Sequence, residues 1–247
     1  MLINPNLPSS KVKTVIASSD ITPEMRMTLE TLGIDVITLT GKLNCDPAVR
    51  NHPDLYFSHL SGECLLFSKN VCSLSGELPC KAENVNILLS SENALTYKDE
   101  VFFNCVSIGE DIICNPKLIH PEVLKYASTY GKRLIPVKQG YTKCNICVVD
   151  DKAIITEDKG ICRVLVEYGY DVLLLDVGAV ELRGHEYGFI GGASGKISKD
   201  MLAFFGCIEK HPEFEKISAF LKARGITPVS LSDERLTDYG SLMPIFE

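Results

Sequence analysis

The sequence lacks tryptophan, an excess of positive charge and any long apolar run. The missing tryptophan excludes no class of protein. The net charge of −7 argues against nucleic acid or an anionic membrane surface as the main partner, because both are bound through basic patches. No apolar run approaches the roughly 18 residues that a membrane span requires, so we expect no membrane partner.

A secretory signal and a disulfide framework are missing as well. The first residues, MLINPNLPSSKVK, have no apolar core. The ten cysteines are scattered, and many lie in apolar runs such as NICVV and DIICN, where cysteine serves as a small apolar residue. These features predict a cytoplasmic protein whose cysteines are reduced.

The sequence also lacks a complete phosphate-binding loop. Its most glycine-rich stretch, GHEYGFIGGASGK at 184–196, ends in Gly-Lys, but Ile197 follows where a P-loop needs serine or threonine. Ile190 stands where the first glycine of that motif belongs, and no helix opens directly after the glycines. We interpret 189–197 as a strand whose small residues let backbones approach closely, with ligand binding by exposed amides as the alternative.

What the sequence does contain is a repeated unit of about fifty residues. Four segments have helical capping residues or a closing glycine, and an apolar strand follows each of them. They are TPEMRMTLETLG (22–33), PKLIHPEVLKYASTYG (116–131), DKGICRVLVEYG (158–169) and HPEFEKISAFLKARG (211–225). Three of the four follow two strands joined by a polar turn, at 104–115, 145–156 and 191–206.

The two ends of the chain look like halves of one further unit. Residues 11–20 predict a strand followed by a helix, and 236–247 predict a strand with no helix after it. We therefore predict an α/β fold, a five-bladed pseudo-symmetric α/β propeller built from ββαβ units, with 1–247 as a single domain. The helix of the second unit is not recognised, so the structure of 61–95 is left open.

This organisation resembles the guanidine-modifying enzyme superfamily, which includes arginine deiminases, amidinotransferases and dimethylarginine hydrolases. PDLYFSHL at 53–60 is similar to the superfamily's P-N-L-Y-F-T-R-D. GITPVSLSDERLTDYGSLMPI at 225–245 resembles its last unit, where G-I-E-V-I-x-I leads to R-C-x-x-x-P-L. The resemblance is strongest to a bacterial branch of unknown function that carries a similar GFIGGASGK stretch.

The resemblance implies a cysteine nucleophile, a His-x-Asp pair and carboxylates that grip the planar guanidinium. In this sequence the corresponding positions are Leu60, Val101 to Asn104, Lys143 with Asn145, and Tyr239 or Gly240. All have changed residue type, and no cysteine follows Cys207. The resemblance therefore implies a branch that lacks the catalytic residues, and we do not expect the standard deiminase or amidinotransferase reaction.

We expect polar groups from several units to converge on an axial pocket for a small polar molecule. The predicted ligand-binding residues are Asp54, Asn104, Lys143, Asn145, Tyr187, Gly192, Ser194, Asp238 and Tyr239. The catalytic residue is unknown, and the candidates are Cys144, His59 and His185. Lys143 suggests an acidic ligand, and its charge beside Cys144 would lower the pKa of the thiol. The alternatives are hydrogen bonds at strand ends for the asparagines and ordinary core or surface positions for the histidines.

The pair Cys144-x-x-Cys147 does not predict a metal site. Residues three apart on a strand face opposite sides, and no second pair stands at zinc spacing. We expect neither a metal nor a cofactor.

Three functions remain open from the sequence. The favoured one is a small-molecule-binding protein of the guanidine-modifying fold without its chemistry. The second is an active hydrolase or transferase of amidine, guanidine or amide C–N bonds, with Cys144 as a relocated nucleophile. The third is a scaffold or oligomerising protein without a ligand. The sequence does not predict the oligomeric state.

Overall fold

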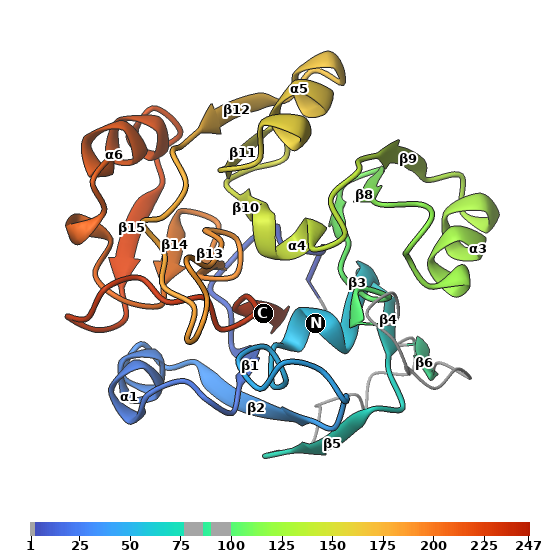
Figure 1. The fold of residues 1–247 in the computed structure, drawn as a ribbon, viewed down its shortest axis with the longest axis horizontal. Helices are drawn as coiled ribbons and strands as arrows, with labels where there is room; N and C mark the ends of the chain where they lie inside the picture. The colour runs from blue at the N-terminus through green and yellow to red at the C-terminus, as the bar shows by residue number, and fades with distance from the viewer. Residues whose placement is uncertain (1–2, 77–85, 90–99) are drawn as a thin grey trace.

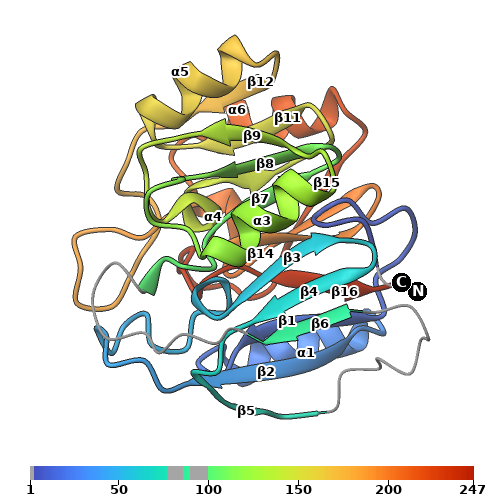
Figure 2. The same ribbon diagram turned by 90° about the vertical axis from the view of Figure 1, so that its right-hand side faces the viewer.

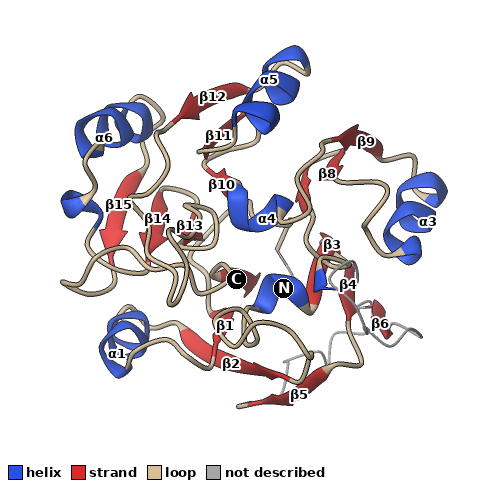
Figure 3. Ribbon diagram, in the orientation of Figure 1, coloured by secondary structure: helices blue, strands red, loops and turns tan. Residues whose placement is uncertain are grey.

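The computed structural model describes residues 3–76, 86–89 and 100–247, which form five small β-sheets around the middle of the molecule (Figure 1). Four helices of nine residues lie on the outside (Figure 3). They are α1 (Pro23–Thr31), α3 (Pro121–Thr129), α5 (Lys159–Glu167) and α6 (Phe214–Lys222). A short helix, α4 (Thr142–Asn145), lies near the middle instead.

Four of the sheets repeat one arrangement of three strands. The first two strands pair antiparallel, and the third pairs parallel to the second. The first sheet contains β3 (Phe57–Ser61), β4 (Cys64–Phe67) and β6 (Asn86–Leu89). The second contains β7 (Val106–Ile108), β8 (Asp111–Cys114) and β9 (Arg133–Pro136). The third contains β10 (Cys147–Val148), β11 (Ala153–Thr156) and β12 (Asp171–Leu174). The fourth contains β13 (Ser194–Ser198), β14 (Met201–Phe204) and β15 (Thr227–Ser230).

The fifth sheet joins the two ends of the chain. It contains, in spatial order, β16 (Met243–Phe246), β1 (Thr14–Ser18), β2 (Asp35–Gly41) and β5 (Val71–Leu74). Strand β16 is antiparallel to β1, and β2 is parallel to β1. The amide of Ile3 also donates to the carbonyl oxygen of Ile245 at 3.0 Å, so the ends of the described chain lie together (Figure 2). The prediction that the two ends complete one unit is confirmed.

Local signals explain where the outer helices begin and end. The Thr22 hydroxyl accepts from the amide of Met25 at 3.2 Å and caps α1. The Asp158 carboxylate caps α5 by accepting from the amides of Gly160 and Ile161 at 2.7 and 2.8 Å. A glycine with positive φ follows each of the four helices, which ends them as the sequence predicts. These glycines are Gly33, Gly131, Gly169 and Gly225.

The unit of β3, β4 and β6, which is the second unit of the sequence repeat, departs from the pattern. Its connection from β4 to β6 contains β5, which pairs antiparallel with β2 of the neighbouring sheet, with Leu74 opposite Leu39. Part of the segment left open by the sequence, at 77–85 and 90–95, lies outside the described residues. In the described part, the connection therefore contributes a strand to the fifth sheet.

Two predicted elements differ from the structure. The strand predicted at 189–197 begins only at Ser194, because the residues before it form turns. The strand predicted from Asn145 begins at Cys147, and Cys144 lies on α4. Cys144 and Cys147 therefore do not share a strand, and the prediction that they face opposite sides of one is wrong.

The apolar core is divided into five clusters that each join two neighbouring sheets. Residues of the fifth sheet pack with the β3 sheet in one cluster and with the β13 sheet in another. The β13 sheet packs with the β10 sheet, the β10 sheet with the β7 sheet, and the β7 sheet with the β3 sheet. The sheets thus follow one another in cyclic order, and each buries its two faces against two neighbours.

The described ranges also bear on membrane spans and on the state of the cysteines. None of the helices there has the length and apolar character needed to cross a bilayer. The nine cysteines in those ranges are all free thiols.

Replacing Ile245 by alanine should lower the free energy of unfolding by about 3 kcal/mol, because a buried isoleucine loses its packing. Ile245 lies on β16, is fully buried and packs with Ile16 and Phe57. Chemical denaturation measures the change. The matched control Val166→Ala, at a position 55% exposed on α5, should stay within about 0.5 kcal/mol of the parent. Equal effects of the two substitutions would show that the paired ends are not part of the cooperative fold.

Candidate functional site

A cavity of about 360 Å³ gathers side chains from distant parts of the chain. It is lined by Asp46, Val49, His52, Tyr141, Cys144, Leu182, His185, Glu186, Tyr187, Phe189 and Asp238. An adjoining cavity of about 660 Å³ shares Asp46, Leu182 and Asp238 with it. A third, of about 590 Å³, is lined by neither cysteine nor histidine. Of these three cavities, the first combines a thiol, imidazoles and carboxylates among its described lining residues.

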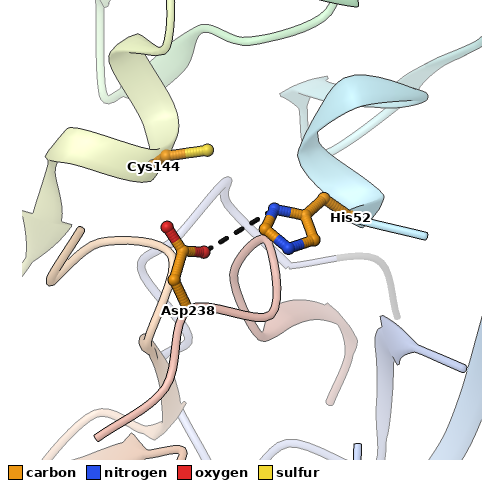
Figure 4. A group of neighbouring side chains, drawn as sticks. All are labelled: His52, Cys144 and Asp238. Atoms are coloured by element: carbon orange, nitrogen blue, oxygen red, sulfur yellow. Dashed lines mark ion pairs between the residues drawn. The ribbon is translucent and has the colours of Figure 1, made fainter. Parts of the chain in front are cut away.

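Three of its lining side chains, His52, Cys144 and Asp238, point toward one another (Figure 4). His52 precedes the short helix η1 (Pro53–Leu55), Cys144 lies on α4, and Asp238 lies between β15 and β16. One ligand atom from each residue lies within 4.8 Å of the other two. His52 Nδ1 is 3.7 Å from Asp238 Oδ1. All three residues are buried, with exposed fractions of 2 to 3%.

The Asp238 carboxylate is held by backbone groups. The amide of Gly240 donates to Oδ1 at 2.9 Å, and the amide of Phe189 donates to Oδ2 at 3.0 Å. Burial raises the pKa of Asp238 to about 6, although these two N–H groups act in the opposite direction. Asp238 therefore changes charge close to neutral pH.

The Cys144 thiol lies between two polar side chains. Its Sγ donates to Asp54 Oδ2 at 3.0 Å, and Asn104 Nδ2 donates to Sγ at 3.4 Å. Burial raises the pKa of the Cys144 thiol well above its usual value, and the nearby Asp54 carboxylate raises it further. In this structure the thiol is therefore protonated near neutral pH.

Asp54 is a second buried carboxyl group beside the thiol. Its Oδ2 also accepts from the Ser241 hydroxyl at 2.8 Å, whereas its Oδ1 has no hydrogen-bond partner. Burial raises the pKa of Asp54. Ser241 has a φ of 73°, a conformation that non-glycine residues adopt only at an energetic cost. That conformation places its hydroxyl against Asp54.

Lys143 contacts this network rather than the cavity. Its Nζ donates to the Ser241 hydroxyl at 3.1 Å, and Lys143 is not among the residues that line the cavity. Burial lowers the pKa of the Lys143 ammonium group. The position of Lys143 thus gives no support to the expectation that it binds an acidic ligand.

Asn104 and Asn145 both support α4. Asn104 Oδ1 accepts from the amides of Lys143 at 2.6 Å and Cys144 at 3.4 Å, and its Nδ2 donates to the carbonyl oxygen of Asp54 at 3.2 Å. Asn145 Nδ2 donates to the carbonyl oxygen of Tyr141 at 2.9 Å. Asn104 therefore positions the thiol, and Asn145 holds the helix itself.

Two of the predicted residues line the outer part of the cavity. Tyr187 is 36% exposed. His185 Nε2 lies 3.2 Å from Asp46 Oδ2, and the two side chains are 42% and 51% exposed. Among the candidate histidines, His185 therefore lies beside the cavity but does not belong to the buried group of His52, Cys144 and Asp238.

Three other predicted residues do not line this cavity. His59 is buried on β3, its Nε2 has no partner, and burial lowers its pKa to about 4. Ser194 donates from its hydroxyl to the carbonyl oxygen of Gly191 at 3.4 Å. Tyr239 packs its ring edge-on to Phe205 at 5.4 Å and lines the adjoining cavity. The structure thus does not bring His59 together with Cys144.

Gly191 and Gly192, in the stretch at 184–196, allow close backbone approach. A Cβ atom at Gly191 would lie 2.5 Å from the carbonyl oxygen of Lys143, and one at Gly192 would overlap Asp238 Oδ1. The amide of Gly192 also donates to the carbonyl oxygen of Cys144 at 2.7 Å. The interpretation of these glycines as close-approach residues is confirmed, although they precede the strand.

Sequence reasoning missed three residues of this region. His52 directly precedes the PDLYF stretch, a position that could have indicated its importance. Ser241 carries no signal of its own in the sequence. Glu157 is buried, its Oε2 accepts from the amide of Ile190 at 2.9 Å, and its Oε1 has no partner. Burial raises the pKa of Glu157 to about 7.

The charges of the cavity favour a cation. Among the described residues, its lining contains the carboxyl groups of Asp46, Glu186 and Asp238 and neither lysine nor arginine. Burial lowers the pKa of His52, so its imidazole is neutral at neutral pH. Chemically, the site combines a nucleophile, a base and carboxyl groups. The donor atoms of His52, Cys144 and Asp238 could also hold a metal ion.

Replacing Gly192 by alanine should lower the free energy of unfolding by about 2 kcal/mol, because its Cβ must displace the Asp238 carboxylate. Urea denaturation measures the loss. The control Gly76→Ala should be nearly neutral, because the nearest atom to its new Cβ would be 3.7 Å away. Unchanged stability of Gly192→Ala would contradict the packing of this glycine on Asp238.

Replacing Glu157 by glutamine should stabilise the protein more at pH 8 than at pH 5. The carboxyl group ionises near pH 4.5 when unfolded but near 7 when folded, so stability is lost as the pH rises between these values. Glutamine cannot ionise, and the difference should reach at most about 3 kcal/mol. Denaturation at several pH values measures it. The control Glu63→Gln, at an exposed position, should change the free energy of unfolding by less than about 0.5 kcal/mol at either pH, and a flat profile for Glu157→Gln would refute the raised pKa.

Comparison with solved structures shows a likeness of fold. Inosamine-phosphate amidinotransferase StrB1 from Streptomyces griseus has a TM-score of 0.61 and 8% identity, over 98% of this chain and 96% of that chain. The SxtG amidinotransferase from Microseira wollei has a TM-score of 0.53 and 12% identity, over 94% and 92%. Agmatine deiminase from C. jejuni has a TM-score of 0.50 and 12% identity, over 94% and 90%.

These TM-scores show that the chain has a mixed α/β fold like that of the two amidinotransferases and the deiminase, the fold that the sequence resemblance implies. They do not establish that the chain lacks catalytic residues. No curated protein matches the sequence. Because the model of a family described as a family of unknown function (DUF6873) matches residues 16–243, the chain belongs to that family.

Proposed function

We propose that this protein is an enzyme that cleaves a C–N bond of a small amidine or guanidine compound, with Cys144 as its nucleophile. The observation that carries the proposal is the convergence of the Cys144 thiol, the His52 imidazole and the Asp238 carboxylate in one cavity. A nucleophile, a proton carrier and a carboxylate are the groups that such a reaction needs.

The fold supports this assignment if the five sheets are the blades of a five-bladed α/β propeller, which is how we interpret them. The cyclic order of the apolar clusters supports that interpretation. Segments of different blades then meet near the axis, so a reacting group need not come from one particular blade. The sequence resemblance places the His-x-Asp pair at Lys143 and Asn145, on either side of Cys144. It places the nucleophilic cysteine at Tyr239 or Gly240, next to Asp238.

The substrate is a cation because the cavity is acidic. Asp238 lies in the buried group, and Asp46 and Glu186 line the same cavity. A guanidinium or amidinium group offers several N–H donors in a plane, which suits carboxylate acceptors on more than one side. The small polar molecule predicted from the sequence is thus a positively charged one.

The bound cation also activates the nucleophile. The Cys144 thiol is neutral in the empty site, and a positive charge beside it lowers its pKa. The thiol proton passes to the neutral His52 imidazole, which lies within 4.8 Å of Sγ, through one bridging nitrogen or water. The thiolate then attacks the amidinium carbon, an S–C bond forms, and the π electrons of that carbon move to nitrogen.

The leaving amine departs with the proton that the thiol lost. His52 lies within 4.8 Å of the thiol, a separation that leaves room for one substrate nitrogen between them, and it carries the proton to that nitrogen. The C–N bond breaks, an amine is released, and an S-amidinium adduct remains on Cys144. Water or a second amine attacks the adduct carbon, breaks the S–C bond and regenerates the thiol.

A second candidate is a protein that binds the same cation without reacting with it. The raised pKa of the Cys144 thiol and its hydrogen bond to Asp54 favour this candidate, because both keep the sulfur protonated. No observation specifically favours a scaffold without a ligand. We retain from the sequence the proposals of a cytoplasmic location and of partners other than nucleic acid and membranes.

A pair of matched alkylating reagents tests the proposed site. Chloroacetamidine is cationic and chloroacetamide is its neutral counterpart, and both alkylate thiols. We expect chloroacetamidine to modify Cys144 at least about tenfold faster, because an acidic cavity concentrates cations. Peptide mass spectrometry locates the modification. Cys144→Ser should abolish it, whereas Cys162→Ser, at a half-buried cysteine on α5, should not. Equal rates for the two reagents would contradict a cation-binding site at Cys144.

Turnover separates the two candidates. The intact protein is incubated with a panel of guanidines and amidines, and released amine or ammonia is measured alongside the mass of the protein. Release that depends on Cys144 supports the enzyme, and an S-amidinium adduct would identify the nucleophile. Thermal stabilisation by a guanidine without any release would overturn catalysis in favour of binding.

A further inference from the structure

We infer that His52, Cys144 and Asp238 form a binding site for one divalent metal ion of the zinc type. The three residues come from separate segments of the chain, and the donor atoms that they present are an imidazole nitrogen, a sulfur and a carboxylate oxygen. Zinc is bound in proteins by these three kinds of atom. The inference does not depend on the proposed reaction.

The distances fit an ion with three protein ligands. Tetrahedral zinc with bonds of 2.0 to 2.3 Å places its ligand atoms about 3.3 to 3.8 Å apart. His52 Nδ1 and Asp238 Oδ1 are 3.7 Å apart, within that range. The ligand atoms of all three residues lie within 4.8 Å of one another, so adjustments on the order of 1 Å complete the site.

A buried carboxyl oxygen that accepts a hydrogen bond from no described residue is a second, independent observation beside the proposed ligands. Asp54 is completely buried, and its Oδ1 has no hydrogen-bond partner. Its Oδ2 receives the hydrogen bond from the Cys144 thiol. The buried ammonium group of Lys143 donates to Ser241 instead. An ion bound to Cys144 would place a positive charge beside the Asp54 carboxyl group.

Metal binding would move one proton and leave the charges of these residues balanced. The metal–sulfur bond forms as the Cys144 thiol loses its proton, and Asp54 Oδ2 accepts that proton at 3.0 Å. The protonated Asp54 then donates a hydrogen bond back to the sulfur. Two positive charges on the ion are balanced by the thiolate and by the Asp238 carboxylate. His52 binds as the neutral imidazole, the form in which histidine ligates metals.

The ion would keep a coordination position open toward the cavity, because all three ligands are lining residues. Three protein ligands with an open fourth position are typical of accessible zinc sites, whereas structural sites are closed by four. An ion on Cys144 uses one lone pair of the sulfur. The proposed reaction, in which the thiol is the nucleophile, is that of the metal-free protein.

Titration of the chelator-treated full chain with Co²⁺ tests the inference. We expect one equivalent to bind, with the visible bands of four-coordinate cobalt and the near-ultraviolet band of a cobalt–thiolate bond. Competition with a chromophoric chelator then gives the affinity for Zn²⁺. Loss of an outer hydrogen-bond partner weakens metal sites by about 10 to 100-fold, so loss of a direct ligand should weaken this one by more than about 100-fold.

The variants distinguish this site from the other thiols and histidines. Cys144→Ser should abolish the thiolate band, and His52→Gln and Asp238→Asn should weaken Zn²⁺ binding. Cys162→Ser and His185→Ala should bind Zn²⁺ like the parent chain. Thermal unfolding shows which variants fold. For any that do not, the parent chain alkylated at Cys144 serves instead, and it should lose the thiolate band.

Two results would overturn the inference: no stoichiometric Co²⁺ binding by the parent chain, or a thiolate band that persists after Cys144 is replaced or alkylated. Both readouts are independent of turnover. Metal binding without any preference for chloroacetamidine would leave the metal site standing and remove the proposed substrate class. A preference for chloroacetamidine without metal binding would support the proposed substrate class and remove the metal site.

Discussion

The surrounding structure has to stabilise two carboxyl groups that are buried around one thiol. Asp54 and Asp238 are both removed from water, and burial raises the pKa of each as well as that of Cys144. Charged groups are costly in such a place unless they are paired or hydrogen-bonded. Backbone amides hold Asp238, but one oxygen of Asp54 has no partner. The group is therefore poised to receive a cation, whether an organic one or a metal ion.

Close backbone packing makes this arrangement sterically feasible. Gly192 packs directly on the Asp238 carboxylate, and Gly240, with a φ of 75°, packs against His52. Side chains at either position would separate the segments that now meet. Ser241 adopts a left-handed backbone conformation beside them and places its hydroxyl on Asp54. The closely packed glycines and the left-handed Ser241 thus position the buried polar groups and do not form a nucleotide-binding loop.

Under the proposed function, the repeated architecture explains how the reacting groups can differ from those that the sequence resemblance implies. The positions that the resemblance assigns to the superfamily's chemistry hold Leu60, Lys143 and Tyr239 in this sequence. The thiol and a carboxylate lie one residue away from two of those positions, at Cys144 and Asp238. In the five-unit interpretation, segments of several units face a common centre. A reacting group that shifts by one residue in one unit can therefore be compensated by a shift in another unit. Comparing positions within single motifs cannot detect such an exchange.

The sequence by itself determined the outer helices, most of the hairpins and the joining of the chain ends, because caps, closing glycines and apolar alternation act over a few residues. It also determined that polar groups near 54, 104, 144 and 238 are brought together, since they occupy equivalent places in the repeat. Only the tertiary structure decided that Cys144 lies on a helix, where Asn104 from another unit holds its backbone and Gly191 packs on it. The same is true of His52, which no local pattern connects with Cys144 or Asp238. Contacts between distant segments depend on how the sheets pack, and packing leaves no short-range period in the sequence.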